Sequence, residues 1–78
     1  MTGTYQLAPQ FLIEVRREGE RLMAQLTGQP PFEIFPEAPL EFFWKVVDAQ
    51  IRFTEEDGVV TGAVFSQDGR TVEIDKVG

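Results

Sequence analysis

The chain has 78 residues, a formal net charge of -6, no cysteine and no histidine. This length allows one small domain, and the composition excludes disulfide bridges, thiolate zinc sites, cysteine nucleophiles and histidine general bases. An acidic surface repels phosphates, so no nucleic-acid partner is expected. The apolar stretches are too short for a membrane span and nothing resembles a signal peptide, so no membrane partner is expected, while the compartment stays open.

Apolar and polar residues alternate with period two along most of the chain. Phe11, Ile13 and Val15, for example, alternate with Glu14 and Arg16. This alternation predicts strands with one buried and one exposed face, whereas the helical period is supported only over a short stretch. Eight strands are expected, at about residues 3–8, 11–17, 20–26, 31–35, 40–46, 49–55, 59–66 and 70–77.

Turn residues separate these strands about every ten positions. Asp57-Gly58 and Asp68-Gly69 are pairs suited to the positive φ angles of tight hairpins. The two prolines in Pro36-Glu37-Ala38-Pro39 predict a break in the chain, and Val47-Asp48 predicts a weaker turn. Because all connections are short, neighbouring strands pair antiparallel in an up-and-down order.

An open sheet of eight strands would leave one apolar face and two edges in water, and closure removes both. We therefore expect an all-β fold, a small eight-stranded antiparallel up-and-down barrel that forms a single domain over residues 1–78. A barrel of this size is either filled by side chains or holds one small ligand. The expected interior comprises Tyr5, Leu7, Phe11, Ile13, Val15, Leu22, Ala24, Leu26, Phe32, Ile34, Phe42, Trp44, Ala49, Ile51, Phe53, Ala63, Phe65, Val72 and Ile74.

The interior aromatics are the candidate ligand contacts, with core packing as the favoured interpretation. They are Tyr5, Phe32, Phe42, Trp44, Phe53 and Phe65. Four apolar residues on consecutive strands alternate in the opposite phase to the interior residues, so they would point outward. They are the candidate interface on one outer wall, and the alternative is that bulges shift the alternation locally. They are Leu12, Met23, Phe35 and Phe43.

Candidate catalytic and metal-binding groups are few. The carboxylates of Glu55, Glu56 and Asp57 do not follow a calcium-loop pattern and are expected at a solvated hairpin tip. Ser66 is the only serine, and no Ser-x-x-Lys sequence links it to a base. No metal, cofactor or catalytic residue is therefore expected.

An ordered set of segments resembles the lipocalin-like domain found at the C-terminus of beta-lactamase-related serine hydrolases, a family of unassigned function. The resemblance implies a small antiparallel barrel appended to a catalytic domain, with the nucleophile and its lysine outside the barrel. The segments are Gly3-Thr4-Tyr5, Val15–Gly19, Leu22–Pro30, Phe32–Glu37, Phe42-Phe43, Val47–Phe53, Gly58–Phe65 and Asp68-Gly69-Arg70.

These observations favour a non-catalytic accessory or scaffold barrel that acts through protein contact. The expected partners are a serine hydrolase catalytic domain or a second copy of this chain. Two alternatives stay open: a miniature lipocalin-like binder of a small apolar ligand, and a designed or excised stable barrel with no evolved activity of its own. The volume left inside the barrel discriminates the ligand binder from the scaffold.

Overall fold

Period-two alternation gives strands along nearly the whole chain, because successive side chains of an extended backbone point to opposite faces of a sheet. A computed structural model describes all residues from Met1 to Gly78 and contains eight strands and no helix. The strands are β1 (Gly3–Ala8), β2 (Phe11–Glu18), β3 (Arg21–Leu26), β4 (Phe32–Ala38), β5 (Glu41–Trp44), β6 (Ala49–Glu56), β7 (Val59–Gln67) and β8 (Arg70–Lys76).

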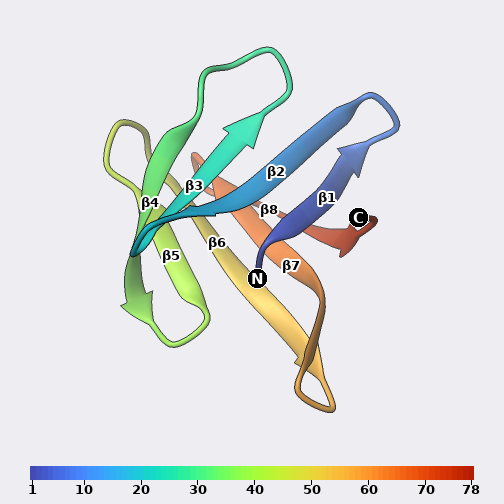
Figure 1. The fold of residues 1–78 in the computed structure, drawn as a ribbon. Coiled ribbons are helices and arrows are strands. Elements are labelled where there is room, and N and C mark those ends of the chain that lie inside the picture. Colours follow the sequence, from blue (N-terminus) through green and yellow to red (C-terminus); the bar gives the residue numbers. More distant parts are fainter.

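Each strand pairs antiparallel with the next one, and β8 returns to β1, so the sheet is a closed barrel (Figure 1). This confirms the expected fold class and topology. The β1–β8 ladder is short, with Tyr5 opposite Lys76 and Gln6 opposite Asp75. Backbone hydrogen bonds between Thr4 and the last two residues extend this seam. In contrast, β6 pairs with β7 along its whole length.

Two tight hairpins depend on the Asp-Gly pairs that the sequence analysis identified. Asp57 and Gly58 have φ angles of 52° and 80°, and Asp68 and Gly69 have φ angles of 51° and 83°. Two successive positive φ angles match the right-handed twist of the flanking strands, which explains why these turns close β6–β7 and β7–β8.

The core is formed only by apolar side chains. Fourteen residues are buried and hydrophobic, no buried residue is polar or charged, and all fourteen belong to the expected interior. Leu7, Leu22 and Phe32, also expected inside, pack against this cluster as half-buried residues, and so do Leu40 and Val60, which the pattern did not identify. The buried residues are Tyr5, Ile13, Val15, Ala24, Leu26, Ile34, Phe42, Trp44, Ala49, Ile51, Phe53, Ala63, Phe65 and Ile74.

Two residues expected in the interior are exposed instead. Phe11 is 37% exposed and Val72 is 44% exposed. Phe11 lies where the β1–β2 register shifts between Gln6 and Ala8, and Val72 lies on β8 beyond the end of the β1–β8 ladder. The alternation continues through both residues, but the wall of the barrel ends before it encloses them.

The boundaries of β4 and β5 also differ from the prediction. The break expected over Pro36–Pro39 occurs only at the end of this segment, because β4 continues to Ala38 with a register shift between Pro36 and Ala38, and the turn follows at residues 39–40. Beyond Ile34, β4 pairs only with β5, so its other edge is free and the missing N–H of a proline interrupts no ladder there. β5 ends at Trp44, so residues 45–46, which were expected at the end of this strand, lie in a bend over residues 45–48 that includes the expected turn at Val47-Asp48.

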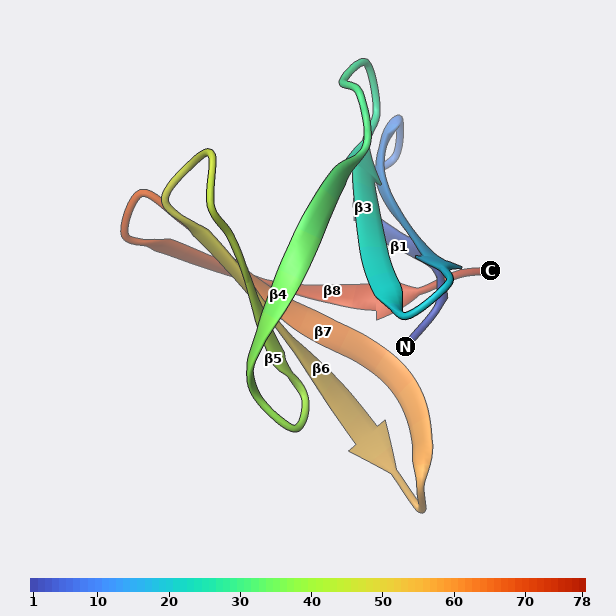
Figure 2. The same ribbon diagram turned by 60° about the vertical axis from the view of Figure 1, so that its left-hand side comes forward.

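The two ends of the barrel differ (Figure 2). At one end, called the mouth, lie the turns at residues 9–10, 27–31, 45–48 and 68–69. At the other end, called the base, lie the remaining turns and both chain termini, which Thr4 and Gly78 hold together by backbone hydrogen bonds. Met1 and Thr2 lie beside Leu22 and Phe42 at the base.

Candidate functional site

The six candidate ligand contacts divide into two groups. Tyr5 and Phe42 each pack against Phe53, with ring centroids 5.4 Å and 5.8 Å away, and all three are buried in the middle and base of the barrel. Trp44 and Phe65 form a separate edge-to-face pair at the mouth, with centroids 5.6 Å apart, and Phe32 belongs to this second group. The first group is therefore core, although Phe42 also borders a depression at the base, and the second group lies at the mouth.

Tyr5 is a buried ionisable group. Burial raises the pKa of its phenol to about 12. Its hydroxyl donates a hydrogen bond to the carbonyl oxygen of Met1, at 2.5 Å. A neutral phenol with this bond satisfied stabilises the fold and offers neither a base nor a free donor to a substrate.

A hollow lies at the mouth, between the β3–β4 and β5–β6 turns and the end of β7. Its volume is about 320 Å³, and its lining contains no charged residue. Three of the six candidate ligand contacts, Phe32, Trp44 and Phe65, line it. The complete lining is Leu26, Gln29, Pro30, Phe32, Trp44, Val46, Val47, Ala49, Phe65 and Gln67.

The alternation of apolar and polar residues did not indicate the residues that complete this hollow. Val46 and Val47 are 61% and 47% exposed on the bend after β5. The available signal was an apolar pair within a segment expected to turn, where side chains are usually polar. Trp44 donates no hydrogen bond within the chain, and no buried side-chain polar atom lacks a partner, so its Nε1 atom is not fully buried.

The structure brings together only part of the candidate interface. Phe35 and Phe43 are opposite each other on β4 and β5, with ring centroids 5.9 Å apart. The Nζ atom of Lys45 lies 3.9 Å from the centroid of the Phe35 ring, a cation–π contact that the pattern did not predict. We call Phe35, Phe43 and Lys45 the outer aromatic patch.

The other two candidate interface residues lie apart from each other. Met23 is opposite Arg16 on β2 and Glu33 on β4, so charged side chains flank it. Leu12 lies four positions along β2 from Arg16, and a second outward pair, Glu14 and Gln25, separates it from Met23. All four candidates are half-buried and none is fully exposed. Leu12 is therefore not part of the same patch.

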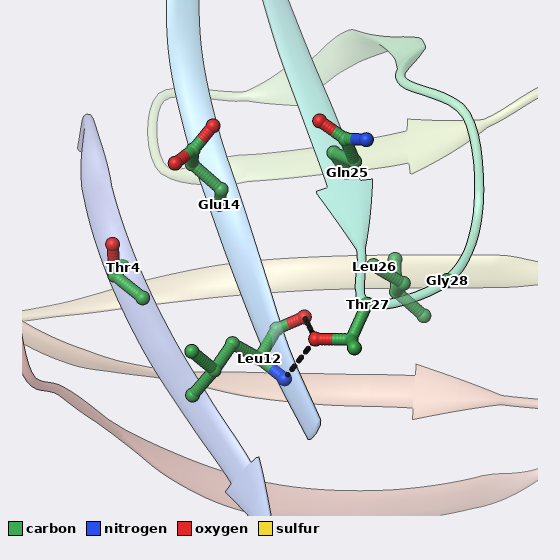
Figure 3. Close-up of a pocket in the computed structure, with 7 residues that line it drawn as sticks. All are labelled: Thr4, Leu12, Glu14, Gln25, Leu26, Thr27 and Gly28. Atoms are coloured by element: carbon green, nitrogen blue, oxygen red, sulfur yellow. Dashed lines mark hydrogen bonds between the residues drawn. The ribbon is translucent and has the colours of Figure 1, made fainter. Parts of the chain in front are cut away.

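Leu12 instead borders a polar depression on the outside of β1–β3 (Figure 3). The hydroxyl of Thr27 accepts a hydrogen bond from the Leu12 amide at 2.9 Å. The Glu14 carboxylate pairs with Arg16 at 2.7 Å, and Arg16 also donates to Gln25 at 3.2 Å. Thr27, Glu14 and Gln25 are therefore engaged in contacts within the chain.

The remaining candidate groups form no recognised catalytic arrangement. The Ser66 hydroxyl lies 3.2 Å from the Thr71 hydroxyl, and no base contacts it. Glu55, Glu56 and Asp57 are exposed at the β6–β7 hairpin. The structure contains no group of three or more acidic side chains arranged to hold a metal ion. It also contains no helix long and apolar enough to cross a membrane.

Comparison with known proteins places this barrel among relatives. Penicillin-binding protein 4* of Bacillus subtilis (strain 168) is 28% identical over 71 residues, which is 91% of this chain. The matched segment is 16% of that protein, so the chain spans less than a fifth of the length of this relative. No solved structure matches the chain. Residues 1–76 match the family described as a domain of unknown function, DUF3471, and the chain belongs to that family.

Proposed function

We propose that this barrel is a non-catalytic accessory domain that docks onto the catalytic domain of a beta-lactamase-related serine hydrolase. The outer aromatic patch is the observation that carries this proposal. Two phenylalanine rings and a cation lie together on the outside of the barrel, whereas the core is already complete without them. Clustered aromatic side chains are typical of protein interfaces.

The size of the relative supports an intramolecular contact. In a protein where this segment is 16% of the length, the barrel is tethered to a much larger remainder. A tether gives the partner surface a high effective concentration, so a small patch suffices for docking. The absence of any unpartnered buried polar side chain supports a role in which the barrel interior does no chemistry.

The test compares two outward residues that have similar burial. Phe43→Ser removes half of the aromatic pair, and Leu12→Ser changes a half-buried residue on a different part of the wall. We expect Phe43→Ser to weaken binding to the separately produced catalytic part of such a hydrolase by about tenfold, and Leu12→Ser by less than about twofold. Calorimetric titration gives both affinities.

The same substitution distinguishes docking onto a hydrolase from association with a second copy of this chain. If the barrel self-associates at millimolar concentration and Phe43→Ser abolishes this, a second copy is the occupant of the patch. If Phe43→Ser changes neither the affinity for the hydrolase nor self-association, the proposed docking function is wrong.

A further inference from the structure

The hollow at the mouth is a feature that docking through the outer aromatic patch does not use. It lies at the opposite end of the barrel from both termini, so a chain continuing from either terminus starts away from it. Its volume of about 320 Å³ lies within the range of small-molecule sites, and its lining is largely apolar with a few polar groups, as in such sites.

The depth of the hollow limits the shape of an occupant. Below Ala49 at the mouth, the next inward residues of β6 are Ile51 and Phe53, and each is only 1% exposed. These side chains fill the barrel, so an extended acyl chain has no channel to enter. An apolar cavity of about 150 Å³ holds one benzene ring, and a hollow about twice as large therefore fits roughly two fused rings.

The charge of the site limits the chemistry of an occupant. The lining contains no lysine or arginine to pair with an anion, and the net charge of -6 opposes anion binding. The lining also contains no carboxylate to pair with a cation. A charged molecule would lose the hydration of its charge on entering this hollow without gaining a partner of opposite charge. An uncharged molecule avoids this cost, so the site favours an uncharged ligand.

The polar groups of the site specify one further property of the ligand, which is a hydrogen-bond acceptor. The Nε1–H of Trp44 has no acceptor within the chain, and the amides of Gln29 and Gln67 border the hollow. Phe65 and Trp44 offer aromatic surfaces beside this donor. Val46 and Val47 at the rim are left partly in water, and a bound molecule would cover them.

From these observations we infer that the mouth binds an uncharged planar molecule of about two fused rings that carries a hydrogen-bond acceptor for Trp44. The rings pack against Trp44 and Phe65 while the rim valines cover the outer face. This inference is independent of docking through the outer aromatic patch, because the two surfaces share no residue.

A matched pair of fluorescent probes tests the class of ligand. Prodan is uncharged and carries a ketone acceptor and a dimethylamino group on two fused rings, and dimethylaminonaphthalene sulfonate has the same rings and amine with an anionic sulfonate in place of the ketone. We expect the uncharged probe to bind one site saturably in the low micromolar range, about tenfold or more tighter than the sulfonate. Because Trp44 is the only tryptophan, its emission should be quenched in step with the rise in probe fluorescence.

A matched pair of variants tests the location. Val46→Asp places a carboxylate at the rim of the hollow, and Val59→Asp places one at the base, where Val59 is 62% exposed against 61% for Val46. We expect Val46→Asp to weaken binding of the uncharged probe at least about fivefold, and Val59→Asp less than about twofold. Both residues are exposed, so unfolding midpoints should change little.

Three results would overturn the inference. The first is an absence of saturable binding by the uncharged probe. The second is equal affinity for the sulfonate, which would contradict the charge argument. The third is an equal effect of the two substitutions, which would place the probe elsewhere on the barrel.

Discussion

At the scale of single residues, Tyr5 links burial to pH dependence. Its phenol is fully buried and its pKa is raised to about 12 from 10.0. The unfolded chain therefore loses this proton at lower pH than the folded chain does. The contribution of Tyr5 is fully present below pH 10 and is lost as the pH rises toward 12, and it amounts to roughly 2–3 kcal/mol at about 1.36 kcal/mol per pKa unit.

The measurement uses the fact that Tyr5 is the only tyrosine. Tyrosinate absorbance in the folded protein should appear near pH 12. The free energy of unfolding of the native chain should fall by roughly 2–3 kcal/mol relative to that of Tyr5→Phe as the pH rises from 10 through 12, from above the value of the variant to below it. The substitution itself should cost about 1 kcal/mol at neutral pH through the lost hydrogen bond to Met1. A phenol that titrates at its ordinary pKa in the folded protein would contradict this prediction.

The alternation of single residues was sufficient to predict the core but not its edges. All fourteen buried residues follow from period two, because each side chain on a half-buried strand has only two faces to choose between. Phe11 and Val72 follow the same rule and are nevertheless exposed, since exposure at a barrel end depends on where neighbouring strands stop. The contact of Lys45 with Phe35 depends on a bend that no local pattern specifies.

At the scale of strands, Gly62 on β7 marks a place where two backbones approach closely. A Cβ atom added there would lie 2.5 Å from the carbonyl oxygen of Ile74 on β8. Gly62→Ala should therefore displace β8 and destabilise the barrel by about 1–3 kcal/mol, the usual cost of overpacking. Thr61→Ala, at the exposed neighbour on the same strand, should change stability by less than about 0.5 kcal/mol.

Denaturant unfolding followed by Trp44 fluorescence gives both values. Equal stabilities for the two variants would show that β8 shifts without cost and that the close approach is not a constraint.

Register shifts explain why the strand boundaries were only partly predictable. The ladder shifts between Gln6 and Ala8, between Pro36 and Ala38, and between Thr54 and Glu55. A bulge depends on the strand opposite it, so the residues around Pro36 alone predicted a break where the structure has a continuing strand. The Asp-Gly hairpins were predictable because the φ requirement is local to the two residues.

At the scale of the whole molecule, the β1–β8 seam is the weakest part of the wall. Two opposed residue pairs close it, whereas β6 and β7 pair along the whole of β6. Local opening requires less free energy where fewer backbone hydrogen bonds break. The seam amides of Thr4, Val77 and Gly78 should therefore exchange with solvent deuterium at least about tenfold faster than the ladder amides in the middle of β6 and β7.

Hydrogen exchange followed by nuclear magnetic resonance measures these rates one amide at a time. Equal rates at the seam and in the β6–β7 ladder would show that the barrel opens only by global unfolding.

The site at the mouth could not be predicted from the sequence in the way the core was. Its lining comes from the β3–β4 turn, the β5–β6 bend and the end of β7, which are brought together only by closure of the barrel. Half of the aromatic residues expected to contact a ligand, Tyr5, Phe42 and Phe53, fill the interior instead. How deep the packing reaches depends on strand tilt and stagger, which alternation does not encode.

The hydrogen bonds that join Thr4 to Val77 and Gly78 also determine how this barrel can be combined with other proteins. Because the polypeptide enters and leaves at adjacent points, the barrel fits into a surface loop of a host without forcing apart the two ends of that loop. For the same reason a short peptide could join the two ends into a circle, and the chain could then be cut at an exposed turn such as residues 45–48 without removing any strand from the sheet.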